Sequence, residues 1–96
     1  MKIIFHKDFL KAYARLGKID RKAVDNTIQI FQQNQNDSKL NNHALKGKHG
    51  GVRSLSVKFD LRILFIEQQN YSIVIMLEVG THSQLYGGLR VGRRGM

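Results

Sequence analysis

The chain has 96 residues, of which 42% are hydrophobic, and sixteen Lys and Arg against seven Asp and Glu give a formal net charge of +9. This length suits one domain with a single modest core. The absence of cysteine excludes disulfides, thiolate catalysis and cysteine-ligated metals. The longest apolar runs, residues 63–66 and 73–77, are too short to span a bilayer.

The positive charge favours a polyanion or an acidic protein as partner. Nucleic acid is favoured over a membrane surface, because no segment joins a basic face to an aromatic apolar face. The N-terminal segment Met1-Lys-Ile-Ile-Phe-His-Lys-Asp-Phe has only a short apolar run before further charged residues follow, unlike a secretory leader. Together with the absence of cysteine, this favours a cytoplasmic location.

The first half of the chain has the pattern of one strand and two helices. Residues 2–5 form a short apolar run typical of a strand, and residues 6–16 have apolar positions at helical spacing. Gly17 is expected to end this helix, and Asp20 to cap the next one. The apolar stripe of the second helix consists of Val24, Thr27, Ile28 and Phe31. The short connection predicts an antiparallel helical hairpin that frays near residues 34–36.

Residues 36–51 have no periodicity and are predicted to form a basic loop, at the upper length limit for a loop without a function. Residues 52–57, 61–66 and 72–79 are rich in β-branched and aromatic residues and are separated by turn signals. They predict three strands in an antiparallel meander. The third run is apolar on both faces and is expected inside the sheet.

These elements predict an α+β fold, with an N-terminal strand and a helical hairpin packed on a small, mainly antiparallel sheet. Residues 1–87 are expected to form one domain, and residues 88–96 a basic, flexible C-terminal tail. The spacing of the phenylalanines predicts that they are mostly core residues. They are Phe5, Phe9, Phe31, Phe59 and Phe65.

The candidate catalytic residues begin just after the third predicted strand. His82 titrates near neutral pH and can act as a general acid or base, whereas the alternative is an ordinary turn histidine. Tyr86 follows four residues later and is predicted either to stack on an extruded RNA base or to pack at the sheet edge with its hydroxyl in water.

Arg62 interrupts an apolar strand, so its charge requires a partner or a wet cleft. Asp60 has the same strand parity. One interpretation is an Asp60–Arg62 salt bridge, and the other is a guanidinium directed at a phosphate, whose two oxygens match its planar fork.

The remaining candidates extend the site through the basic loop. His43 is a candidate catalytic residue, whereas Lys46 and Lys48 are candidate phosphate ligands. Arg53 and Lys58 are predicted to contact the RNA backbone rather than to catalyse. The alternative for each loop residue is a solvated basic surface. Four histidines and seven dispersed acids give no recognisable metal-ligand spacing, so neither a metal nor another cofactor is expected.

Several segments resemble the RelE/ParE toxin superfamily, and within it the YafQ-like ribonuclease toxins of bacterial type II toxin–antitoxin systems. The resemblance covers about residues 1–87. It depends on the segments His43-Ala-Leu-Lys-Gly, Gly51-Val-Arg, Asp60-Leu-Arg-Ile-Leu-Phe and Gly80-Thr-His-Ser-Gln-Leu-Tyr-Gly. The final segment is fairly specific, whereas the helical half is generic.

The resemblance implies a microbial-RNase-type α+β fold and a toxin that cleaves mRNA on the ribosome. Since no metal-ligand spacing is present, our first hypothesis is a metal-independent endoribonuclease. The resemblance also implies a cognate antitoxin as partner, in a hetero-oligomer, and places catalytic or RNA-contacting roles on His43, Asp60, His82 and Tyr86. Tyr86 stands where that branch has phenylalanine. Arg62 matches an arginine that RelE-like members use on the phosphate.

Two departures from the YafQ pattern stand out: Ser56 replaces a second histidine and Glu78 replaces an arginine. If Arg62 substitutes for the lost arginine, the site is a hybrid of the two branches; otherwise its activity is weakened or lost. The alternative function is a non-nucleolytic inhibitor of DNA gyrase, as in ParE-type members, or a simple RNA-binding module.

Overall fold

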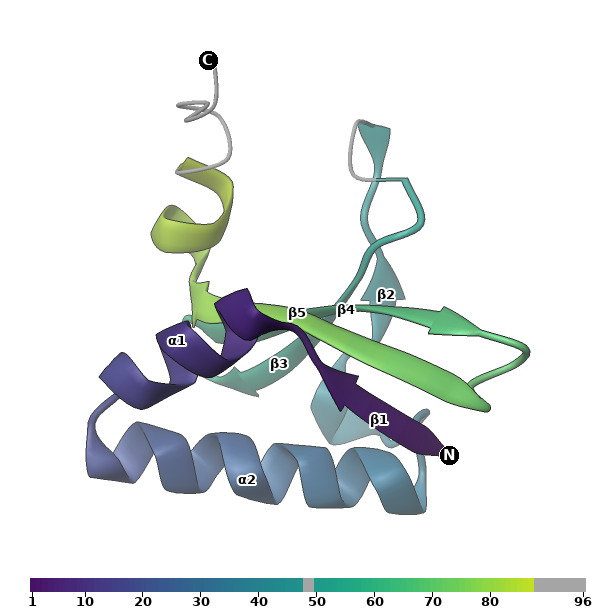
Figure 1. The fold of residues 1–96 in the computed structure, drawn as a ribbon, viewed down its shortest axis with the longest axis horizontal. Coiled ribbons are helices and arrows are strands. Elements are labelled where there is room, and N and C mark those ends of the chain that lie inside the picture. Colours follow the sequence, from purple (N-terminus) through teal and green to yellow (C-terminus); the bar gives the residue numbers. More distant parts are fainter. Residues whose placement is uncertain (48–49, 88–96) are drawn as a thin grey trace.

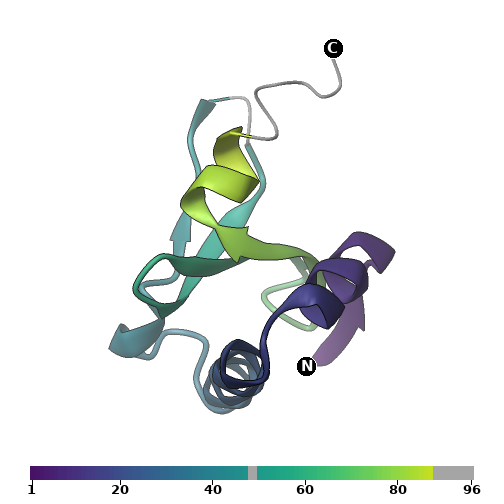
Figure 2. The ribbon, with the colours of Figure 1, turned by 90° about the vertical axis from the view of Figure 1, so that its left-hand side faces the viewer.

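The computed structural model describes residues 1–47 and 50–87. Its elements are β1 (Lys2–Phe5), α1 (Lys7–Arg15), α2 (Lys18–Gln33), η1 (Ser38–Leu40), β2 (His43–Ala44), β3 (Arg53–Lys58), β4 (Leu61–Gln68), β5 (Ile73–Thr81) and η3 (Ser83–Gly87). Both helices lie on one side of the sheet, whereas η3 and the β2–β3 connection rise from the other (Figures 1 and 2). The predicted α+β fold is confirmed.

The sheet has five strands in the order β1-β5-β4-β3-β2. Strands β3, β4 and β5 form the predicted antiparallel meander. Strand β1 pairs with β5 in parallel, which the chain achieves by crossing over through both helices. Strand β5 therefore lies inside the sheet, between β1 and β4, as its two apolar faces predicted.

The helix ends differ from the predicted ones. Helix α1 begins after His6, whose Nδ1 accepts a hydrogen bond from the Asp8 N–H at 3.0 Å, and ends before Leu16. Gly17 is the N-cap of α2, so the prediction that Asp20 caps this helix was wrong. Asp20 lies in the first turn instead, where a carboxylate is favourable beside the helix dipole. It forms an ion pair with Lys58 across to the sheet at 2.7 Å.

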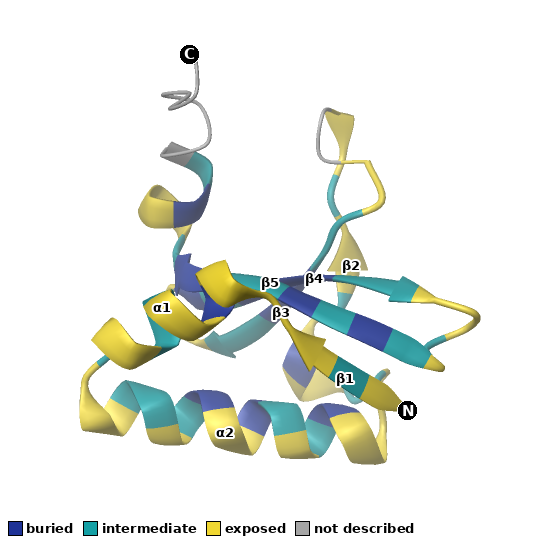
Figure 3. Cartoon of the chain, viewed as in Figure 1, coloured by how far each residue is buried: buried dark blue, intermediate teal, exposed yellow. Residues whose placement is uncertain are grey.

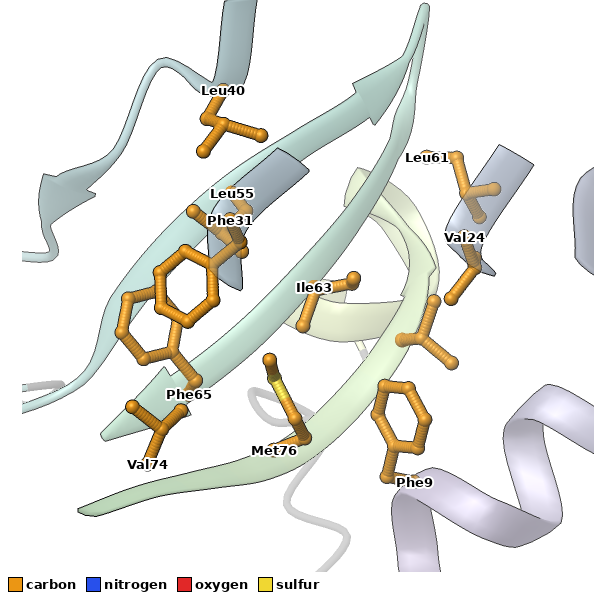
Figure 4. Packing of buried hydrophobic residues seen from close by; sticks show 11 residues of the cluster. Phe9, Val24, Phe31, Leu40, Leu55, Leu61, Ile63, Phe65, Val74 and Met76 are labelled. Carbon is orange, nitrogen blue, oxygen red and sulfur yellow. The ribbon is translucent and has the colours of Figure 1, made fainter. Parts of the chain in front are cut away.

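The hydrophobic core fills the layer between the helices and the sheet (Figure 4). As predicted, Val24, Thr27 and Phe31 form the buried stripe of α2, and the same face is dark in Figure 3. The core also includes Phe9 and Phe65, whereas Phe5 is 39% exposed.

The expected burial of Phe59 was wrong, because its side chain is 99% exposed. It occupies the tight turn between β3 and β4, where no second layer covers it.

The predicted aperiodic loop contains more structure than its sequence indicated. Asp37 caps η1 by accepting a hydrogen bond from the Lys39 N–H at 2.9 Å. Leu40, at the end of η1, is only 1% exposed and belongs to the core. The next residues form the edge strand β2, which pairs with β3. A single buried leucine thus fixes the approach to β2, and one residue carries no periodic signal.

No helix in residues 1–47 and 50–87 is both long and apolar enough to cross a membrane. The predicted tail, residues 88–96, lies outside the described residues.

Candidate functional site

A groove of about 390 Å³ lies on the face of the sheet opposite the helices. In Figures 1 and 2 this is the face from which η3 and the β2–β3 connection project. The lining residues are Asn41, His43, Leu45, Ser54, Arg62, His82 and Tyr86. The fold therefore brings together four of the predicted site residues, from segments that span more than forty positions of the chain.

Strand alternation explains why these side chains share one face. Leu55 and Ile63 point into the core, so their neighbours point away from the helices. The register places Ser56 opposite Arg62, and Arg62 opposite Gly80. A row across three strands thus presents a hydroxyl, a guanidinium and a residue without a side chain.

Arg62 and Asp60 do not form the salt bridge that their parity allowed. The guanidinium Nη1 of Arg62 donates a hydrogen bond to Ser56 Oγ at 3.0 Å. Asp60 Oδ1 accepts a long hydrogen bond, 3.4 Å, from the backbone N–H of His82. Within the described part of the chain, the ion pairs are His6–Asp8 and Lys58–Asp20. The two predicted catalytic groups thus have separate partners: Arg62 contacts Ser56 of β3, and Asp60 contacts the backbone of His82.

His82 and Tyr86 lie together as predicted, with ring centroids 4.5 Å apart and an interplanar angle of 57°. Tyr86 lies in η3, a short helical turn, and His82 directly precedes this turn. His82 is exposed, whereas Tyr86 is partly buried. An exposed imidazole beside an aromatic ring can exchange protons with a substrate in the groove.

A capping box that the sequence interpretation missed opens this turn. Thr81 Oγ1 accepts a hydrogen bond from the Gln84 N–H at 3.1 Å, and Gln84 Oε1 accepts one from the Thr81 N–H at 2.8 Å. The signal was present as Thr81-His-Ser-Gln84, which matches the pattern of Ser or Thr followed three positions later by Glu or Gln.

His43 lies at the opposite wall of the groove, on β2. Its Nδ1 is 2.8 Å from the backbone carbonyl oxygen of Asn41. A carbonyl oxygen only accepts, so this contact places the ring proton on Nδ1. The neutral imidazole then has its lone pair on Nε2, where it can accept a proton.

Ser54 is a site residue that the sequence interpretation did not select, and Ser56 entered it only as a departure from the YafQ pattern. Ser54 is fully buried in the groove wall, and its Oγ has no hydrogen-bond partner among the described residues. Serine hydroxyls have no sequence signal of their own in a strand. Their alternation with Leu55 and Val57 only indicates a two-sided strand.

The predicted RNA-binding cations that the structure describes, Lys46, Arg53 and Lys58, lie in different settings. Lys46 is exposed in the β2–β3 connection, and Lys48 lies outside the described residues. Arg53 donates from Nε to Asn42 Oδ1 at 2.9 Å, and Lys58 pairs with Asp20. Arg53 has the opposite strand parity to Ser54 and Ser56, and the register shift between Ser56 and Lys58 interrupts the alternation before Lys58.

No three His, Asp or Glu side chains in residues 1–47 and 50–87 are grouped closely enough to hold a metal ion. Arg62 is the arginine among the residues that line the groove.

Comparisons with known proteins define the class. A family model described as "Bacterial toxin of type II toxin-antitoxin system, YafQ" matches residues 1–87. The chain therefore belongs to the YafQ family of type II toxins, within the RelE superfamily. No curated protein sequence gives a significant match.

Solved structures show the same fold. YafQ from E. coli strain BL21(DE3) superposes with a TM-score of 0.77 at 18% identity, covering 90% of this chain and 98% of that chain. A YoeB/ParE toxin from Agrobacterium tumefaciens gives 0.72 at 14% identity, covering 85% and 99%. YafQ in the E. coli DinJ–YafQ complex gives 0.65 at 20% identity, covering 90% and 98%.

Proposed function

We propose that this toxin is a metal-independent endoribonuclease that cleaves mRNA on the ribosome. The observation that supports this most is the groove itself, which combines two imidazoles, a guanidinium and an aromatic ring. Such a set supplies proton transfer and phosphate stabilisation without a metal.

In the proposed reaction, the ribose 2′-hydroxyl oxygen attacks the adjacent phosphorus and the bond from phosphorus to the 5′ oxygen breaks. A base, Asp60 or His43, takes the 2′ proton, and protonated His82 donates a proton to the leaving 5′ oxygen. The products are a 2′,3′-cyclic phosphate and a 5′-hydroxyl. Arg62 and Lys46 stabilise the pentacoordinate phosphate, since both carry positive charge at neutral pH.

The two base candidates differ in their setting. His43 has Nε2 available when Nδ1 donates to Asn41, and it lines the groove. Asp60 is exposed and is held near the backbone of His82. A base on the wall opposite His82 suits a phosphate lying between them, which favours His43 for proton removal and leaves Asp60 to support the η3 end.

The proposed partner that controls this activity is an antitoxin. Solved complexes include E. coli DinJ–YafQ and a RelB–RelE pair from Pyrococcus horikoshii OT3. For a chain of charge +9, an acidic or amphipathic antitoxin segment across the groove is the complementary ligand. Cytoplasmic location follows from the proposed ribosomal substrate.

The decisive experiment uses EDTA-treated protein and programmed ribosomes, with the RNA ends analysed after cleavage. Fragments ending in 2′,3′-cyclic phosphate support the proposal. Inhibition of gyrase supercoiling without RNA cleavage would replace it with the alternative gyrase-inhibitor function. RNA or ribosome binding with neither activity would indicate a binding module.

A further inference from the structure

Residues 81–84, which include His82, are held by hydrogen bonds from their backbone N–H groups to side-chain oxygens. The reciprocal hydrogen bonds of Thr81 and Gln84 enclose His82, and the His82 N–H faces the carboxylate of Asp60. A helical turn of five residues is too short to be stable by itself. These contacts therefore decide where the imidazole of His82 stands.

Gly80 belongs to the same unit. A Cβ atom at this position would lie 2.9 Å from Gln84 Oε1 and 3.5 Å from Leu85 Cδ2. A side chain at residue 80 would displace the carboxamide from the position in which it accepts from the Thr81 N–H. Leu85, which is 5% exposed, anchors the next position of the turn.

We infer that Gln84 is a positioning residue, which holds His82 and Tyr86 in their contact geometry through the capping box with Thr81. Only the kinetic test of this role depends on the proposed ribonuclease function. Its structural consequence, the 4.5 Å contact between the two rings, is measurable in the protein alone.

The test compares Gln84→Glu, which keeps a side-chain acceptor, with Gln84→Met, which has similar length but no comparable acceptor. Contacts between the His82 and Tyr86 ring protons are measured by nuclear Overhauser effects, and cleavage by single-turnover kinetics. We expect Gln84→Met to weaken the ring contact and slow cleavage by about 2- to 30-fold, the range for a lost cap. Gln84→Glu is expected to restore both.

Two results would overturn the inference: an unchanged ring contact in Gln84→Met, or a Gln84→Glu protein as impaired as Gln84→Met. A wild-type protein that has the ring contact but cuts no RNA would count against the proposed function and leave the positioning role supported. Circular dichroism spectra of all variants exclude global unfolding as the cause.

A second surface carries an independent inference. Phe59 is almost fully solvent-exposed and has a φ of +34°. The left-handed region of backbone conformation is costly for a bulky residue. Gly, Asn or Asp would adopt it in a two-residue hairpin turn at a lower cost. An aromatic ring is thus retained where exposure and backbone strain both disfavour it.

The position of this turn links it to the groove. Asp60, the next residue, contacts the His82 N–H. Lys58, the preceding one, pairs with Asp20 and has a side chain that is about half exposed. Unpaired RNA binds to such arrangements, because bases stack on exposed aromatic rings beside positive charge. We propose that Phe59 stacks on a base of the substrate RNA next to the cleaved phosphate. This extends the proposed function.

The test measures the toxin concentration for half-maximal mRNA cleavage on programmed ribosomes. Phe59→Ala should raise it by about 5- to 150-fold, the worth of one stacked base, whereas Phe59→Trp should keep it near wild type. The matched control is Ile19→Ala. Ile19 is 77% exposed and precedes Asp20, the ion-pair partner of Lys58.

An unchanged requirement in Phe59→Ala would overturn the stacking role. An equal rise in the required toxin concentration for Ile19→Ala, or a loss of antitoxin binding alone in Phe59→Ala, would assign the surface around Phe59 to a protein interface instead. A wild-type toxin without cleavage activity would refute the proposed function, with which the stacking role would also fall.

Discussion

Arg62 donates a hydrogen bond to the hydroxyl of Ser56, its cross-strand partner, at 3.0 Å. The resemblance to YafQ-like toxins puts a histidine at the position of Ser56. In this chain a small hydroxyl stands there and orients a guanidinium on the open face of the sheet. The contact uses one of five N–H donors of arginine. In the hybrid site that the resemblance suggested, Arg62 is the proposed phosphate ligand.

Removal of this guanidinium should impair cleavage strongly. Arg62→Ala is expected to lower the single-turnover rate by about 10²–10³-fold, as for other transition-state donors. Ser56→Ala is the matched control, because it removes the hydroxyl that accepts from Arg62 and keeps the guanidinium and its charge, so it should cost less than Arg62→Ala. If Ser56→Ala is as damaging as Arg62→Ala, the hydroxyl has a direct role in the reaction.

Replacement of the imidazole at position 82 tests the general acid. His82→Ala should lower cleavage by about 10²–10⁴-fold, the usual contribution of positioned proton transfer. Stability should change little, since the side chain is exposed. Ser83→Ala, a change at an exposed neighbour in the same turn, serves as control. A folded His82→Ala protein that cuts RNA at the wild-type rate would transfer the catalytic role to Arg62 and the lysines.

Salt dependence should distinguish the cations. RNA or ribosome affinity should fall steeply with salt because bound counterions are released. Lys46→Ala should reduce the slope of log affinity against log salt by about 0.7 for one lost contact to single-stranded RNA. Lys58→Ala should reduce it less, because Asp20 binds the Lys58 ammonium group at 2.7 Å. Equal slopes for both variants and wild type would exclude both lysines as phosphate ligands.

Leu40 should contribute to stability like a core residue despite its place in a polar segment. Leu40→Ala is expected to lower the free energy of unfolding by about 2–5 kcal/mol through lost burial and a cavity. Lys39→Ala, a change at the exposed preceding position, is the control. Urea denaturation of both variants measures the difference. A loss below about 1 kcal/mol would mean that the region around η1 collapses to fill the space.

Tyr13 provides a pH-dependent link between the helices. Its hydroxyl donates to Asp25 Oδ1 at 2.7 Å, and this hydrogen bond, followed by slight desolvation and the negative charge of Asp25, raises the pKa of the Tyr13 phenol above 10.0. Because the folded-state pKa is the higher one, the stabilisation is complete below pH 10.0 and is lost as the pH rises through the folded-state value.

Absorbance titration of tyrosinate tests this directly. The component with the raised pKa should disappear in Tyr13→Phe and shift down in Asp25→Asn, which removes the carboxylate but keeps an amide oxygen as acceptor. An unchanged titration in Asp25→Asn would show that the negative charge of Asp25 does not control the pKa of the Tyr13 phenol.

Local sequence determined the elements whose pattern repeats along the chain. The stripe of Val24, Thr27 and Phe31 marked α2, and three β-branched runs marked the meander, because periodic burial leaves a periodic sequence. The motif at residues 80–87 identified His82 and Tyr86 as neighbours, since a short turn brings positions four apart together. The same segment also contained the capping-box signal, which is equally local.

Tertiary structure decided everything that depends on partners far apart in sequence. The pairing of Arg62 with Ser56 rather than Asp60 follows from the β3–β4 register, and the entry of His43 into the groove follows from its pairing with Ser54. Exposure of Phe59 and burial of Leu40 depend on which surface the second layer covers. Sequence alone thus selected most of the chemical groups, whereas register and layer packing determined which of them meet.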